Sequence, residues 1–265
     1  MLFRLLLIGL LLSSFHPVLE AGCCAGANIK FFPTEGELAN GTLLLMEVSG
    51  EYSILKPGYE RGKLDFSAVS DNGKREKLEV LDLQVGRAAA QFLFKIDFDT
   101  IQVGESWHIE TNGTRFKHEV FSRMYKILDE AKWSLGTYTE DHEPPQILSG
   151  IRYEYAAGYY SSGWSYSIRA KVHVVDAGTT YYYYEEAKPP PLLIQIFNEQ
   201  GEYCYLPMDG NSFSFGDGPC GGSFVVEIGE TCEFRARIMD FSNNRSPDKK
   251  LILFTAHEEA PFVKL

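Results

Sequence analysis

The chain has 265 residues, of which 45% are hydrophobic and 14% aromatic, and its formal net charge is −11. This length and apolar fraction exclude a disordered chain and fit two packed domains best. The acidic charge disfavours nucleic acid as a partner, because an acidic surface repels phosphate groups. It also disfavours adsorption to anionic lipid, so membrane association is expected only through an N-terminal lipid anchor.

The N-terminal segment has the pattern of an export signal. Arg4 precedes an apolar run from Leu5 to Leu12, and small residues lead up to Gly22. The run is shorter than the roughly 20 apolar residues that cross a bilayer as a helix. Residues 1–22 are therefore predicted to be a signal peptide, and the mature chain is predicted to work outside the cytoplasm.

Two ways of processing this signal are open. Ala21-Gly22-Cys23 ends like a bacterial lipoprotein signal and predicts lipidation of Cys23, although Glu20 stands where an aliphatic residue is usual. The alternative is ordinary signal-peptidase cleavage after Ala21 or Ala27; after Ala21 it leaves Cys23 as a thiol or a disulfide partner. The expected location is an outer membrane lipoprotein, the periplasm or the cell surface.

Alternating apolar and polar residues predict strands in the first half of the chain, most clearly from Phe92 to Phe98. Asp71-Asn72-Gly73 and Asn112-Gly113 predict tight turns between strands. One segment differs, because the apolar residues of 119–132 match helical spacing and predict a short helix or irregular segment there. Its apolar positions are Val120, Phe121, Met124, Ile127, Leu128 and Ala131.

The second half repeats the alternation after a polar stretch that ends in Pro144-Pro145. Tyr166 to Val174 predicts a long strand with one polar face, and several shorter strands follow. They are expected at Leu192 to Phe197, Phe224 to Ile228, Cys232 to Met239 and Leu251 to Phe254. The fold class is therefore predicted to be mainly β, with the boundary at residues 137–145.

Several short motifs resemble bacterial Ig-like domains. Phe32 to Asn40 looks like their opening strand, and Asp141 to Pro145 is similar to the opening of a following domain. Asp240 to Ser246 resembles their Asp-x-x-Gly-Asn-x-Ser hairpin, with Asn243 in the place of glycine. Asparagine also tolerates a left-handed backbone. The resemblance implies two Ig-like β-sandwich domains in tandem, at 28–136 and 146–265, but it does not choose a function.

Three cysteines lie in the second half. Cys204 and Cys220 flank a polar glycine-rich segment, which predicts a disulfide between them in an oxidising compartment. Cys232 shares the apolar side of an alternating strand with Phe234 and is predicted to be a buried thiol.

Tyrosines are concentrated between residues 153 and 184. The run Tyr181, Tyr182, Tyr183 and Tyr184 is a candidate ligand-binding set, because flat aromatic rings stack on sugar faces. The alternative is that tyrosines fill strands, since they have high β propensity and suit half-buried faces. The remaining members of the concentration are Tyr153, Tyr155, Tyr159, Tyr160, Trp164 and Tyr166.

No motif for catalysis, a cofactor or a metal is evident. The acidic residues Glu140, Asp141 and Glu143 have no recognised calcium-loop spacing and favour a solvated linker over an interdomain calcium site. The Asn-x-Ser/Thr sequences at Asn40 and Asn244 are interpreted as turns, as is the one at Asn112.

The sequence thus predicts a non-catalytic exported cell-envelope protein, a binding or structural module whose partner is a glycan or another envelope protein. The alternatives are a carbohydrate-binding module, or an envelope hydrolase or its accessory domain. A hydrolase would need a cleft with convergent carboxylates.

Overall fold

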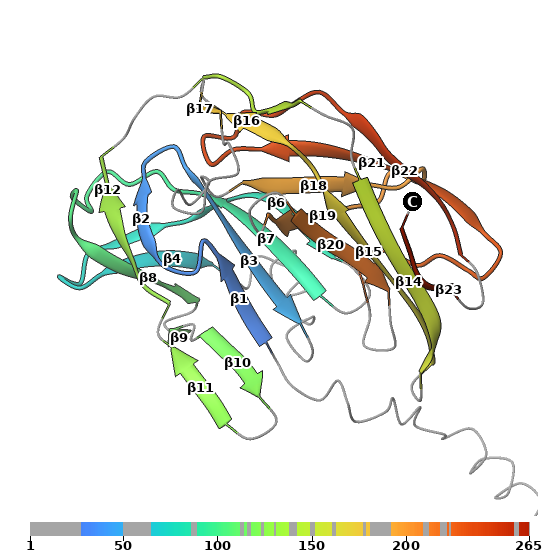
Figure 1. Cartoon of the computed structure of the whole chain (residues 1–265). Coiled ribbons are helices and arrows are strands. Elements are labelled where there is room, and N and C mark those ends of the chain that lie inside the picture. The colour runs from blue at the N-terminus through green and yellow to red at the C-terminus, as the bar shows by residue number, and fades with distance from the viewer. Residues whose placement is uncertain are drawn as a thin grey trace, which may run out of the picture.

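The computed structural model describes residues 28–49, 65–85, 89–111, 114–115, 118–122, 125–129, 131–137, 142–148, 152–160, 163–176, 179–180, 192–208, 212–217, 222, 224–256 and 260–264. Its described elements are all strands (Figure 1). The predicted mainly β fold class is therefore confirmed.

The first half of the chain forms a sandwich of two sheets. Sheet A has the order β1 (Asn28–Phe32), β3 (Leu43–Ser49), β7 (Ala89–Lys95) and β6 (Glu79–Val85). Sheet B has the order β2 (Gly36–Ala39), β12 (Trp133–Gly136), β8 (Ser106–Thr111), β4 (Phe66–Ser70) and β5 (Arg75–Lys77), and β9 (Thr114–Arg115) pairs with β8. Only β2 and β12 pair in parallel among the described strands. In this order the chain alternates between the two sheets as it does in Ig-like sandwiches.

The core between sheets A and B is aromatic. Phe66 of β4 contacts Phe92 and Phe94 of β7 edge to face, with ring centroids 5.1 Å apart in both pairs. Trp107 and Trp133, on neighbouring strands of sheet B, lie 5.0 Å apart and are fully buried. Alternate residues of each strand supply these rings, because successive side chains of a strand point to opposite faces.

The second half forms another sandwich. Sheet E has the order β20 (Ser212–Asp217), β15 (Gly163–Lys171), β14 (Arg152–Tyr160) and β23 (Ala260–Lys264). Sheet F has the order β19 (Tyr203–Pro207), β18 (Leu193–Phe197), β21 (Thr231–Met239) and β22 (Lys249–Thr255). A small sheet of β13 (Gln146–Ile147), β16 (Val174–Asp176) and β17 (Thr179–Thr180) completes this half. Its core includes Ile168, Ile196, Phe234 and Phe254.

The helix predicted for residues 119–132 is wrong. The segment contains β10 (His118–Ser122) and β11 (Tyr125–Asp129), which pair antiparallel. Val120 and Ile127 are partners in this hairpin. A spacing of seven residues is two helical turns, which places both residues on one face of a helix. In this hairpin the same spacing separates two residues that face each other across the strands. The spacing alone therefore could not distinguish a helix from a hairpin.

Two predicted turns are confirmed by the backbone. Gly73 has a φ of 80° in the turn from β4 to β5, and its N–H donates to the carbonyl of Ser70. Asn243 has a φ of 65° and occupies the left-handed position that its resemblance to a glycine hairpin implied. Asn112 and Gly113 lie outside the described residues, so the turn predicted there stays a prediction; the flanking residues Thr111 and Thr114 pair antiparallel.

Strand pairing falls into two sets. Within the described residues, the strands up to β12 pair only with one another, and so do the strands from β13 onward. A domain boundary at residues 137–145 stays a prediction, and residues 138–141 lie outside the described part of the chain. No described helix is long and apolar enough to cross a membrane.

Candidate functional site

The two sandwiches meet through the outer faces of sheets A and F. Leu43, Leu45 and Leu93 of sheet A form one buried cluster with residues of sheet F, and each is at most 2% exposed. The members from sheet F are Leu193, Tyr205 and Met239. In Figure 1, β18 and β19 lie beside β6. We call this contact the intersheet interface.

A buried glutamine connects the two halves of the interface. Gln91 of β7 is 6% exposed, and its Nε2 donates to the backbone carbonyl of Tyr205 at 2.7 Å. The Oε1 of Gln91 accepts from the backbone N–H of Tyr205 at 2.8 Å, and Nε2 also donates to Glu47 at 2.9 Å. The side-chain amide thus satisfies both backbone groups of one residue, as a neighbouring strand would.

A carboxylate lies at the edge of this interface. Asp82 of β6 accepts hydrogen bonds from the hydroxyls of Tyr203 at 2.9 Å and Tyr205 at 2.5 Å. Burial and the bond to Asp82 raise the pKa of Tyr203 to about 12, and the same causes raise the pKa of Tyr205 further. Both hydroxyls therefore stay protonated and keep donating throughout the physiological pH range.

The Tyr205 hydroxyl also accepts from Gln195, whose Nε2 lies 3.2 Å away. Gln195 is 4% exposed, and its Oε1 is buried without a hydrogen-bond partner. Such an unsatisfied buried acceptor costs stability. The interface is thus a mixture of leucine packing and directed polar contacts.

The hairpin after β21 extends the interface. The carbonyl of Phe241 accepts from the backbone N–H of Leu43 at 2.8 Å, and its ring lies 5.7 Å from that of Phe32. Asp240 fixes the hairpin, because its Oδ1 accepts from the N–H of Asn244 at 2.8 Å. The left-handed Asn243 closes the turn that presents Phe241 to the first sandwich.

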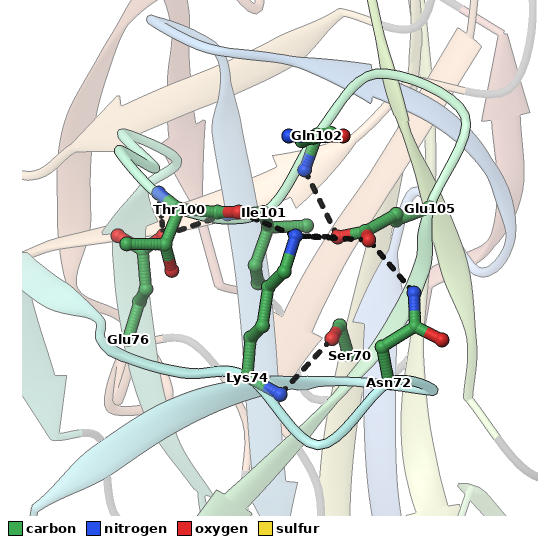
Figure 2. A network of polar contacts seen from close by, with 8 residues as sticks. All are labelled: Ser70, Asn72, Lys74, Glu76, Thr100, Ile101, Gln102 and Glu105. Carbon is green, nitrogen blue, oxygen red and sulfur yellow. Dashed lines mark hydrogen bonds and ion pairs between the residues drawn. The ribbon is translucent and has the colours of Figure 1, made fainter.

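A second polar cluster lies away from this interface, at the turn from β4 to β5 (Figure 2). Lys74 Nζ contacts the Glu105 carboxylate at 2.9 Å and donates to the carbonyl of Thr100 at 2.8 Å. Glu76 accepts hydrogen bonds from the backbone N–H groups of residues 99, 100 and 101. Burial opposes the charge of Glu76, but a hydrogen bond from the Thr100 hydroxyl at 2.7 Å and these backbone bonds hold its pKa below the ordinary value. The cluster ties the loop before β8 to the β4–β5 turn.

The contribution of this loop to the free energy of unfolding should depend on pH, because it relies on the charge of Glu105. The backbone N–H of Gln102, followed by the ion pair with Lys74 and the amide of Asn72, lowers the pKa of Glu105 from 4.5 to about 2. A carboxyl whose folded pKa is lowered contributes stability above its unfolded pKa and loses it as pH falls through the folded value. We expect a free energy of unfolding that falls between pH 4.5 and about 2, with a smaller fall in Glu105→Gln. Urea titrations across this range measure it, and equal slopes for both proteins would contradict it.

Most of the described tyrosines fill strands. Tyr155 and Tyr166 are 8% and 3% exposed, and both rings pack on Phe254 in the second core. Tyr153 and Trp164 are half-buried against the same core. The side chains of Tyr159 and Tyr160 and the whole of Tyr181, Tyr182, Tyr183 and Tyr184 lie outside the described residues, so the predicted ligand-binding set stays a prediction.

The cysteine predictions have different outcomes. Cys232 is 4% exposed in the second core, as predicted, and burial raises the pKa of its thiol. Cys204 is buried there too. Cys220 and the predicted lipidation site Cys23 lie outside the described residues, so the disulfide and the lipid anchor stay predictions. Within the described part of the chain, no group of three His, Cys, Asp or Glu residues is placed to hold a metal.

Sequence reasoning missed the intersheet interface. One signal for it was present: the run Leu43 to Met46 is apolar on both faces of its strand, and all four side chains are at most 2% exposed. A strand that faces solvent on one side alternates instead. Gln91 and Asp82 gave no such signal, because a polar residue in an alternating strand indicates an exposed face.

No family model matches the chain, and no curated protein matches it. Similar solved structures include a pullulanase from Anoxybacillus sp. LM18-11 at 7% identity and a TM-score of 0.24, with 88% of this chain and 28% of that chain covered. Fibronectin(III)-like modules of Clostridium thermocellum CbhA match at 8% identity and a TM-score of 0.24, covering 88% and 95%. A DUF4785 family protein from Legionella pneumophila matches at 10% identity and 0.22, covering 89% and 55%. Similarity this low supports no conclusion about activity.

Proposed function

We propose that this chain is a non-catalytic exported protein of the cell envelope, a structural or binding module whose two sandwiches act as one rigid unit. The supporting observation is the intersheet interface. Tandem domains are expected to move relative to one another unless their interface is large and hydrophobic. Here the leucine cluster is buried, and Gln91 and Asp82 add hydrogen bonds across it. A rigid pair holds its two ends at a fixed distance, which suits a spacer or scaffold.

Rigidity is tested by small-angle X-ray scattering of the mature chain. We expect the wild type to fit a single compact shape. Leu93→Asp places a carboxylate in the buried cluster and should increase the radius of gyration, because an unpaired buried charge drives the sheets apart. The matched control is Leu253→Asp on β22, since Leu253 is 55% exposed. A wild-type profile that requires many domain orientations would refute the rigid unit.

Export and anchoring are tested in the native host. Intact-mass spectrometry of the mature protein should show an N-terminal acylated cysteine at position 23, and Cys23→Ser should release the protein into the soluble fraction. A mature species that begins at Gly22 or Asn28 and carries no acyl mass would contradict the lipid anchor. The protein would then be a freely soluble secreted form.

The carbohydrate-binding alternative now rests on Tyr181 to Tyr184, since Tyr155 and Tyr166 belong to the second core. A glycan array measures the binding. Loss of binding in the double variant Tyr182→Ala, Tyr184→Ala, or in the double variant Tyr181→Ala, Tyr183→Ala, would support this alternative. Binding that survives both double variants would assign recognition to another surface.

A further inference from the structure

Three asparagines of the chain are followed directly by glycine, at Asn40, Asn72 and Asn112. In such a pair the backbone nitrogen of glycine attacks the side-chain amide carbon of asparagine, because glycine has no side chain to obstruct the approach. The new C–N bond closes a succinimide ring and expels ammonia. Water then opens the ring to aspartate or isoaspartate, so the reaction needs no other reagent.

The structure protects the first of these pairs. The Nδ2 of Asn40 donates to the carbonyl of Phe98 at 2.9 Å, and its Oδ1 accepts from the N–H of Phe98 at 2.9 Å. The attacking nitrogen is also engaged, because Gly41 donates to the carbonyl of Ile96 at 2.7 Å. Asn40 is half-buried. Both of its side-chain hydrogen bonds must therefore break, with little water to replace them, before the amide can rotate toward the nitrogen of Gly41.

The second pair is far more accessible. Asn72 and Gly73 are both exposed in the turn from β4 to β5. The Nδ2 of Asn72 donates to Glu105 at 2.7 Å in a contact that is open to solvent (Figure 2). A Cβ placed on Gly73 would meet no atom within 4 Å. Gly73 donates to Ser70 at 2.9 Å, but this bond belongs to an exposed turn that opens more readily than the packed end of a sheet.

We propose that Asn72 is a site of spontaneous deamidation in the folded chain, whereas Asn40 is protected. The product carries a carboxylate where Nδ2 now donates to Glu105, so a hydrogen bond becomes a repulsion between like charges. Asp71 adds a further carboxylate beside the turn and already pairs with Lys132 at 2.6 Å. Lys74 then has to offset the carboxylates of Glu105 and of the new residue at position 72. The loop before β8 also loses the hydrogen bond that Asn72 donates to Glu105.

Peptide mapping of the full chain tests the site. After incubation at mildly alkaline pH, we expect the peptide with Asn72 to gain about one dalton and isoaspartate at least about tenfold faster than the peptide with Asn40. The difference reflects the two half-buried side-chain hydrogen bonds that Asn40 must break, against the single exposed one of Asn72. In urea, both peptides should react at comparable rates. No isoaspartate at Asn72 while the chain in urea reacts, or equal rates in the folded chain, would overturn the proposal.

The consequence for the loop is tested with two variants. Asn72→Asp and Asn72→Ser both remove the amide donor, but only the first adds a charge beside Glu105. We expect Asn72→Asp to have the lower melting temperature at neutral pH, and the difference should shrink in high salt. Equal melting temperatures would overturn the charge repulsion assigned to the product.

Discussion

Replacing Tyr205 by alanine is expected to lower the free energy of unfolding by about 3–5 kcal/mol, the range for losing a large buried ring. Tyr205 is 1% exposed and packs in the leucine cluster between sheets A and F. Its hydroxyl also donates to Asp82 and accepts from Gln195. The substitution therefore leaves a cavity and removes polar contacts at the same place, and urea denaturation measures the loss.

The matched control is Tyr203→Phe. Tyr203 contacts the same carboxylate through its hydroxyl, but its side chain is half-buried and its ring is retained in the variant. We expect a loss of about 0.5–1.5 kcal/mol, the net value of one hydrogen bond. If Tyr205→Ala cost no more than this control, the interface would contribute little to stability, and the proposed rigid unit would lose its main support.

Local patterns in the sequence predicted local structure well. Alternation predicted several strands, including β18 and β21, and the buried thiol of Cys232. The strand predicted at Phe224 to Ile228 is wrong: Phe224 and Val226 are buried as the alternation implied, but within the described residues the segment pairs with no strand. The tolerance of asparagine for a left-handed backbone predicted the turn at Asn243, where φ is 65°. These features depend on a few neighbouring residues. The hairpin of β10 and β11 shows the limit, since the same seven-residue spacing of Val120 and Ile127 also fits a helix.

The intersheet interface depends on residues that are far apart in the sequence. Gln91 and Tyr205 are separated by 114 positions, and nothing near either one indicates the other. Tyrosine in a strand is equally compatible with a core, an exposed face or an interface. The sequence could therefore suggest that both faces of the Leu43 to Met46 strand are covered, but not which surface covers the outer one.

Gln91→Ala is the second substitution with a large expected effect. It leaves the backbone N–H and carbonyl of Tyr205 without the partners that now lie at 2.8 and 2.7 Å. Each buried backbone group without a partner costs about 1–3 kcal/mol, so we expect a loss of about 2–6 kcal/mol for the two groups, measured by urea denaturation. The control is Gln84→Ala, because Gln84 faces Gln91 across the strands but its amide bonds Asp82 on its own strand.

Gln91→Glu separates the hydrogen-bonding role of this residue from its size. The glutamate has nearly the same shape, but its ionised form cannot donate to the carbonyl of Tyr205, and it would stand against Glu47, which now accepts from Gln91 at 2.9 Å. Burial and the neighbouring carboxylate should raise the folded pKa of the new group above its unfolded value. The loss relative to wild type should then be largest at neutral pH and shrink as pH falls through that raised pKa, because the protonated carboxyl donates again. A loss that does not change with pH would mean that the amide acts through its shape alone and does not bond the backbone of Tyr205.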